Sequence, residues 1–135
     1  MSIKQGVTYR NNAAAQAGGS GAGTTGFIKI WSGSAPSDPD ASATGTLLAH
    51  WNLSGSIAWS TPSAGETHMT GLPFAGVVDA GGTAGYFRLL DSGSNTLLQG
   101  TVTATGGGGD MTVGSTTITS GDTVQITSFS FTVPQ

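Results

Sequence analysis

The sequence contains no cysteine, which excludes a disulfide scaffold, a thiolate metal site and a thiol nucleophile. Charge is also scarce: 8% of the 135 residues are charged, where ordinary domains carry about 25%. Four basic and seven acidic residues give a net charge of −3, a poor match to a protein that must neutralise nucleic-acid phosphates. No apolar run approaches the roughly 20 residues that span a bilayer. We therefore expect no direct nucleic-acid partner and no membrane partner.

Small and hydroxylated residues fill much of the chain instead. Glycine occupies 23 positions, and glycine, threonine and serine together account for 59 of the 135 residues. A surface of this kind can pack against copies of itself or against a lattice without removing water from ions. The composition therefore favours a structural assembly protein. No apolar segment follows Lys4 in the opening residues, so we expect no secretory signal and synthesis in the cytoplasm.

Residues 1–26 differ from the rest of the chain. No large apolar side chain stands between Ala13 and Gly26, so this segment can bury little surface to offset its ordering entropy. Lys4 and Arg10 are its charged residues, whereas residues 27–135 carry all seven acids. We expect a flexible, extended, electropositive arm over 1–26, either docking on another subunit or fraying as a terminus, followed by one body over 27–135.

The body consists of short β-type runs. Apolar and polar residues alternate over 46–53, and the runs 85–90 and 96–103 flank a turn at 91–95, which predicts a hairpin. The alternation changes phase between Ile126 and Phe129, which indicates a β-bulge. No stretch keeps a helical period. We predict an all-β fold, a single antiparallel β-sandwich or jelly roll of about eight strands behind the extended N-terminal arm.

Candidate catalytic and metal-binding patterns are weak. His50 and His68 belong to no His-x-His or His-Glu-x-x-His pattern, so we expect both to be structural or surface residues. Asp38 and Asp40 share a proline-containing loop without the spacing of a calcium loop, and whether they hold an ion stays open. No Gly-x-Ser-x-Gly motif occurs. The other aspartates stand beside Gly, Ala or Ser in turns, where they are expected to cap the backbone: Asp79, Asp91, Asp110 and Asp122. We expect no enzyme activity, no metal and no cofactor.

The larger aromatic residues fall mostly in alternating apolar runs and are expected in the core. Trp59, followed by Ser-Thr-Pro, is the one expected to be partly exposed and open to a partner. Trp59 and Tyr86 could also form a platform for a sugar ring.

Five segments, in this order, resemble a family of small tailed-bacteriophage virion proteins, the β-rich head decoration or cement proteins. They are FIKIWSGSAP (27–36), GTLLA (45–49), GTAGYFR (82–88), LQGTV (98–102) and ITSGDTV (118–124). The resemblance implies a protein on the outer surface of the virion capsid, made in the host cytoplasm. It would strengthen the shell by bridging subunits of the major capsid protein, since binding to the assembled lattice stabilises that lattice.

On this hypothesis Lys4, Arg10 and Trp59 are the candidate capsid contacts, and a homo-oligomer, a dimer or trimer, is expected. The alternative is a tail- or fibre-associated carbohydrate-binding β-sandwich that uses Trp59 and Tyr86. A third possibility is a hydrolase with an unrecognised pair of aspartates.

Overall fold

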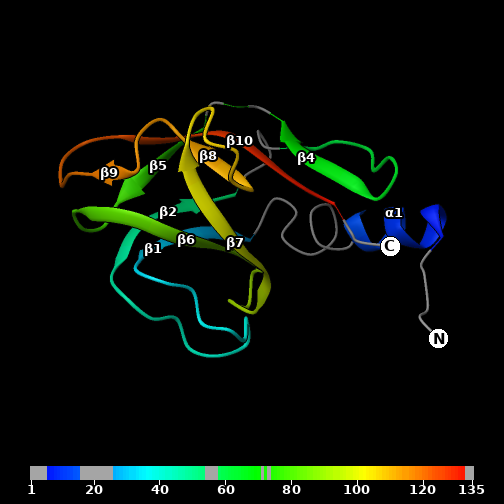
Figure 1. Ribbon diagram of the computed structural model, residues 1–135, viewed down its shortest axis with the longest axis horizontal. Helices are drawn as coiled ribbons and strands as arrows, with labels where there is room; N and C mark the ends of the chain where they lie inside the picture. The colour runs from blue at the N-terminus through cyan, green and yellow to red at the C-terminus, as the bar shows by residue number, and fades with distance from the viewer. Residues whose placement is uncertain (1–5, 16–25, 54–57, 71, 73, 133–135) are drawn as a thin grey trace.

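The computed structural model describes residues 6–15, 26–53, 58–70, 72 and 74–132. Within these residues one short helix precedes ten strands (Figure 1). The elements are α1 (Val7–Ala15), β1 (Phe27–Ser32), β2 (Leu47–Asn52), β3 (Ala58–Trp59), β4 (Glu66–Thr70), β5 (Phe74–Val78), β6 (Gly82–Leu90), β7 (Thr96–Ala104), β8 (Met111–Val113), β9 (Thr117–Ile118) and β10 (Val124–Thr132). The all-β prediction is confirmed, with more strands than expected.

Seven strands close into a barrel in the order β10–β5–β2–β1–β6–β7–β8, and β8 pairs back with β10. A barrel therefore takes the place of the predicted sandwich. The physical reason lies in β10, which pairs with β5 through Val124–Ile126 and with β8 through Ile126–Phe129. A strand paired on both sides leaves no free edge at the seam.

The pair β7–β8 corrects the expectation of a fully antiparallel sheet, because Val102–Ala104 run parallel to Met111–Val113. Parallel neighbours usually need a connection of a dozen residues or more. Here the short loop 105–110 suffices, with Gly106 and Gly108 at φ +87° and +83°. A Cβ on Gly107 would lie 2.8 Å from the side chain of Thr103. The glycine run is therefore a tight return of the chain.

The predicted bulge in the last strand is confirmed, since the register of β10 against β8 shifts between Ile126 and Ser128. Beyond it, Ser130–Thr132 leave the barrel and pair with β4, which in turn pairs with β3. We call the sheet of β3, β4 and the end of β10 the β4 extension. Figure 1 shows β4 and α1 together at the end of the molecule opposite β9.

Residues 7–15, expected to be extended, form helix α1 and lie against β4. Alanine, the best helix former, fills the last three positions, but a nine-residue helix is marginal alone in water. Contacts with β4 are therefore the physical reason that this segment is helical. The helix could not be predicted from the sequence, because its apolar residues do not recur at helical spacing.

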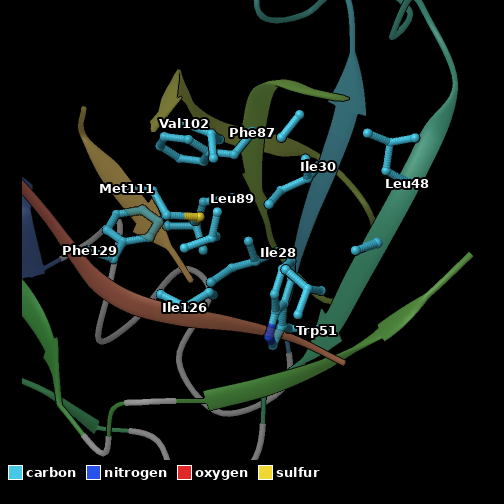
Figure 2. Close-up of a cluster of buried hydrophobic side chains, with 14 of the residues drawn as sticks. Ile28, Ile30, Leu48, Trp51, Phe87, Leu89, Val102, Met111, Ile126 and Phe129 are labelled. Atoms are coloured by element: carbon cyan, nitrogen blue, oxygen red, sulfur yellow. The ribbon is translucent and has the colours of Figure 1, made fainter. Parts of the chain in front are cut away.

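The barrel interior is filled with apolar side chains, which Figure 2 shows pointing toward one another from several strands. Trp51 is 1% exposed, and a Cβ on Gly76 would lie 2.4 Å from its ring, so Gly76 provides the space for this indole. Full burial of each large apolar side chain contributes about 1.5–3 kcal/mol. The fully buried centre consists of Ile28, Ile30, Leu48, Leu89, Met111, Val113, Ile126 and Phe129.

Candidate binding surfaces

Helix α1 is held at the tip of the β4 extension by one peptide unit. The two-residue turn between Ser63 and Glu66 has both central residues in the left-handed region, Ala64 at φ 51° and Gly65 at φ 79°. The Arg10 guanidinium donates a hydrogen bond to the Ala64 carbonyl. The Gly65 N–H donates to Asn11 Oδ1 at 2.7 Å. We call these contacts the latch; they satisfy both polar groups of the 64–65 peptide.

The latch fits closely at Gly65. A Cβ built there would meet the Arg10 side chain at 2.8–3.0 Å, and the positive φ already disfavours an L side chain. Turn geometry and helix docking thus both require glycine at this position.

Two of the three residues predicted to contact a partner lie at this end of the molecule. Arg10 belongs to the latch, and Trp59 lies on β3 of the same extension, partly exposed as expected. Its ring packs edge-on against Phe129 at 5.6 Å and Phe131 at 6.5 Å. Its buried indole N–H has no acceptor among the described residues. The third residue, Lys4, lies outside the described residues.

The aromatic pair predicted as a sugar platform is not brought together in usable form. Tyr86 is 2% exposed, and its ring stacks on Trp31 with the centroids 5.6 Å apart. The loop 33–46 contributes to this burial, since the Tyr86 hydroxyl exchanges hydrogen bonds with the backbone of Thr44. Tyr86 therefore offers no free face to a ligand, which corrects that expectation.

A cleft of about 330 Å³, lined by both polar and apolar side chains, opens on the outer face of the barrel. We call it the β1–β2 cleft; it is lined by Phe27, Lys29, Leu47, His50, Asn52, Asp79 and Ser94. Strands β1 and β2 position its main side chains, because Lys29 lies directly opposite His50 in their register. Sequence reasoning had treated its members separately, since Asp79 is 29 residues from His50 in the chain.

His50 and Asp79 form a close polar contact in the cleft, with Nδ1 and Oδ2 2.7 Å apart. Both side chains are about a quarter exposed, at 26% and 29%. The prediction that Asp79 caps a turn is wrong, because its carboxylate bonds to a histidine on a neighbouring strand. No hydrogen bond joins Ser94 to His50 within the described chain, so the cleft does not contain an assembled Ser-His-Asp relay.

Lys29 provides the cleft with a cation. Its ammonium lies 5.8 Å from the centroid of the Phe27 ring. It forms no ion pair with a carboxylate of the described residues. Because Arg88, the other basic residue of the body, is 5% exposed, Lys29 is the more accessible of the two.

The other aspartates serve local structure in several places. Asp91 caps the β6–β7 turn, and hydrogen bonds from Asn95, with a further one from Gly93, hold the pKa of its carboxyl below the ordinary value. Asp38 accepts from the Asp40 backbone at 2.9 Å, and Asp110 accepts from Thr101. Among the described residues no group of three or more His, Asp or Glu side chains could hold a metal ion.

A second histidine–carboxylate pair lies on β4. His68 Nδ1 and Glu66 Oε1 are 3.3 Å apart, and the side chains are 53% and 39% exposed. This pair borders another cleft of about 410 Å³ with Ser128 and Ser130. It is looser and more open to solvent than the pair at His50.

These features define a small closed β-barrel with a filled interior, a projecting sheet and a docked N-terminal helix. The chain matches no protein-family model, no curated protein and no solved structure. The described residues include no helix long and apolar enough to cross a membrane.

Proposed function

We propose that the chain is a non-enzymatic structural protein of a tailed-bacteriophage virion. It attaches to the outer surface of the assembled capsid and bridges subunits of the major capsid protein. The observation that carries the proposal is a barrel whose interior is occupied by its own packed side chains, in a chain with few charges. Because its interior is filled, such a molecule contacts partners through its outer surface.

The chemistry of that surface suits close contact with a protein lattice. The outward residues at the end of β10, Ser128, Ser130 and Thr132, are exposed and uncharged. Burying a hydroxyl that finds a hydrogen-bond partner costs far less than burying an ion, whose desolvation costs several kcal/mol. A hydroxyl-rich face can therefore be covered by a neighbour at low energetic cost.

We assign the capsid contact to the end of the molecule that carries α1 and the β4 extension. Arg10 and Trp59 lie there, and Lys4 precedes Arg10 by six residues in the sequence. A dimer or trimer would present several such ends to the lattice. Because the second attachment is then effectively intramolecular, modest individual contacts give high avidity.

Co-sedimentation with emptied, expanded capsids of the phage that encodes the chain tests the proposal. We expect binding to saturate at a fixed ratio to the major capsid protein, with no binding to unexpanded shells. Arg10→Ala and Trp59→Ala should each weaken binding, whereas Gln125→Ala, at an exposed barrel position, should not. Circular dichroism of each variant separates lost contacts from lost folding.

The absence of binding to expanded shells by the folded wild-type protein would overturn the proposal. Saturable binding that Arg10→Ala and Trp59→Ala both leave unchanged would instead move the contact away from the α1 end.

A further inference from the structure

We propose that the β1–β2 cleft is a binding site for a carbohydrate, recognised through vicinal hydroxyl groups rather than by stacking on an aromatic platform. The inference does not depend on capsid attachment, because it concerns a different surface. Its cavity of about 330 Å³ lies within the range of small-molecule pockets, about 300–1,000 Å³, and suits a single sugar unit.

The hydrogen-bonding groups of the cleft include both donors and acceptors. Lys29 supplies an ammonium that no carboxylate of the described residues engages. Asn52 supplies an amide, which offers a donor and an acceptor side by side. Asp79 has one carboxylate oxygen, Oδ2, on His50. Its second oxygen forms no hydrogen bond with another described residue and can accept.

The His50–Asp79 contact assigns the donor role to one ring nitrogen of His50. With Nδ1 2.7 Å from a carboxylate oxygen, the ring proton lies on Nδ1. In the neutral ring Nε2 is then an acceptor. A sugar hydroxyl both donates and accepts, so neighbouring hydroxyls can donate to His50 or Asp79 while accepting from Lys29.

Two other ligand classes fit the same groups less well. A carboxylate ligand would be attracted by Lys29 but repelled by the negative charge of Asp79 and by the acceptor nitrogen of a neutral His50. An ammonium ligand would be attracted by Asp79 but repelled by Lys29, which lies opposite His50 in the β1–β2 pair. A neutral polyhydroxylated ligand meets neither repulsion. The Lys29 ammonium lies over the Phe27 ring, so this face of the ring does not stack on a sugar. Recognition therefore depends on hydrogen bonds to the polar side chains.

The chain provides its own internal reference for a test, since it has two histidines and both sit beside a carboxylate. Protein labelled with ¹³C and ¹⁵N in histidine is titrated into the millimolar range with methyl glycosides of glucose, galactose, mannose, rhamnose and N-acetylglucosamine. Succinate and a hexaglutamate peptide form the carboxylate arm. We expect at least one glycoside to shift the His50 signals saturably and to leave those of His68 unchanged.

Matched substitutions then assign the site. Asp79→Asn preserves the shape of the side chain but removes its charge, and should weaken glycoside binding about tenfold. Glu66→Gln makes the same chemical change at the other histidine and should not alter binding.

Three results would overturn the inference. In the first, no glycoside shifts the His50 signals saturably. In the second, only succinate or hexaglutamate shifts them, and in the third, the signals of His50 and His68 shift equally. Asp79→Asn protein that keeps full capsid binding but loses the glycoside would show that the two surfaces act separately. A failure of capsid binding by the wild type would leave the glycoside result unaffected.

Discussion

The Tyr86 hydroxyl and the Thr44 backbone hold each other through two hydrogen bonds. The hydroxyl donates to the Thr44 carbonyl at 2.8 Å and accepts from the Thr44 N–H at 2.9 Å. This reciprocal pair fastens the C-terminal part of the loop 33–46 to Tyr86, whose ring stacks on Trp31. The loop is thereby tied to β6 near its end.

Tyr86→Phe should lower the free energy of unfolding by about 1–3 kcal/mol, because two part-buried backbone groups lose their partner. Urea unfolding followed by tryptophan fluorescence measures the change. Thr44→Ala keeps the backbone groups that Tyr86 uses and loses only a bond from its own hydroxyl to Ser34, so it should cost less. A larger loss for Thr44→Ala than for Tyr86→Phe would contradict this account.

The latch predicts a difference between two adjacent asparagines of α1. Asn11→Ala removes the acceptor of the Gly65 N–H, whereas Asn12 is exposed. Trypsin can cut after Arg10 once the helix opens, and cleavage then follows the population of the open form. We expect Asn11→Ala to speed cleavage after Arg10 several-fold and Asn12→Ala to leave it near the wild-type rate. Equal rates for both variants would mean that the latch does not hold the helix.

The hairpin and the bulge could be predicted because their signals are local. Asp91 and Gly93 mark a turn, and the change of phase between Ile126 and Phe129 marks a bulge, which the structure has. Barrel closure could not be predicted in this way. It depends on β10 pairing with both β5 and β8, and the alternation within β10 shows which residues are buried but not which strands lie beside it.

The same distinction between local and long-range signals applies to the candidate sites. Partial exposure of Trp59 could be predicted from its neighbours in sequence. The His50–Asp79 pair could not, because it requires the register of β2 against β5, in which His50 lies opposite Val77. Helix α1 was missed because its stability depends on a turn 54 residues away in the chain.

Asp91 makes the folded state sensitive to acid. Its folded-state pKa lies below the ordinary value of 3.8, mainly because the Asn95 backbone N–H bonds to the ionised form. A depressed folded pKa adds stability that is present above the unfolded pKa and is lost as the pH falls through the folded pKa. Asp91→Asn should therefore destabilise the protein at neutral pH, and the difference from wild type should shrink below about pH 4. Urea midpoints across the acid range measure this difference, and one that stayed constant would contradict the prediction.

Substitutions at Arg88 and Gln99 should differ in their effect on the free energy of unfolding. The Arg88 side chain is almost fully buried over the Trp31 ring, and its Nε–H donates to Gln99 Oε1 at 2.9 Å. Its Nη2 has no acceptor among the described residues. Replacing a buried charge by an apolar chain of similar length is often neutral or stabilising, whereas removing one partner of a buried polar pair is costly.

Arg88→Met should therefore leave the free energy of unfolding unchanged or raise it, since the methionine can still lie over Trp31. Gln99→Ala should lower it by about 2–3 kcal/mol, because it leaves the Arg88 Nε–H unpaired and also removes the bond from Gln99 Nε2 to the Pro36 carbonyl. In the double variant Arg88→Met/Gln99→Ala the loss should be smaller than in Gln99→Ala alone, since no charge remains to be left unpaired. Chemical unfolding of the four proteins gives the coupling energy directly. A loss of several kcal/mol in Arg88→Met would instead mean that the guanidinium stabilises the loop through its charge.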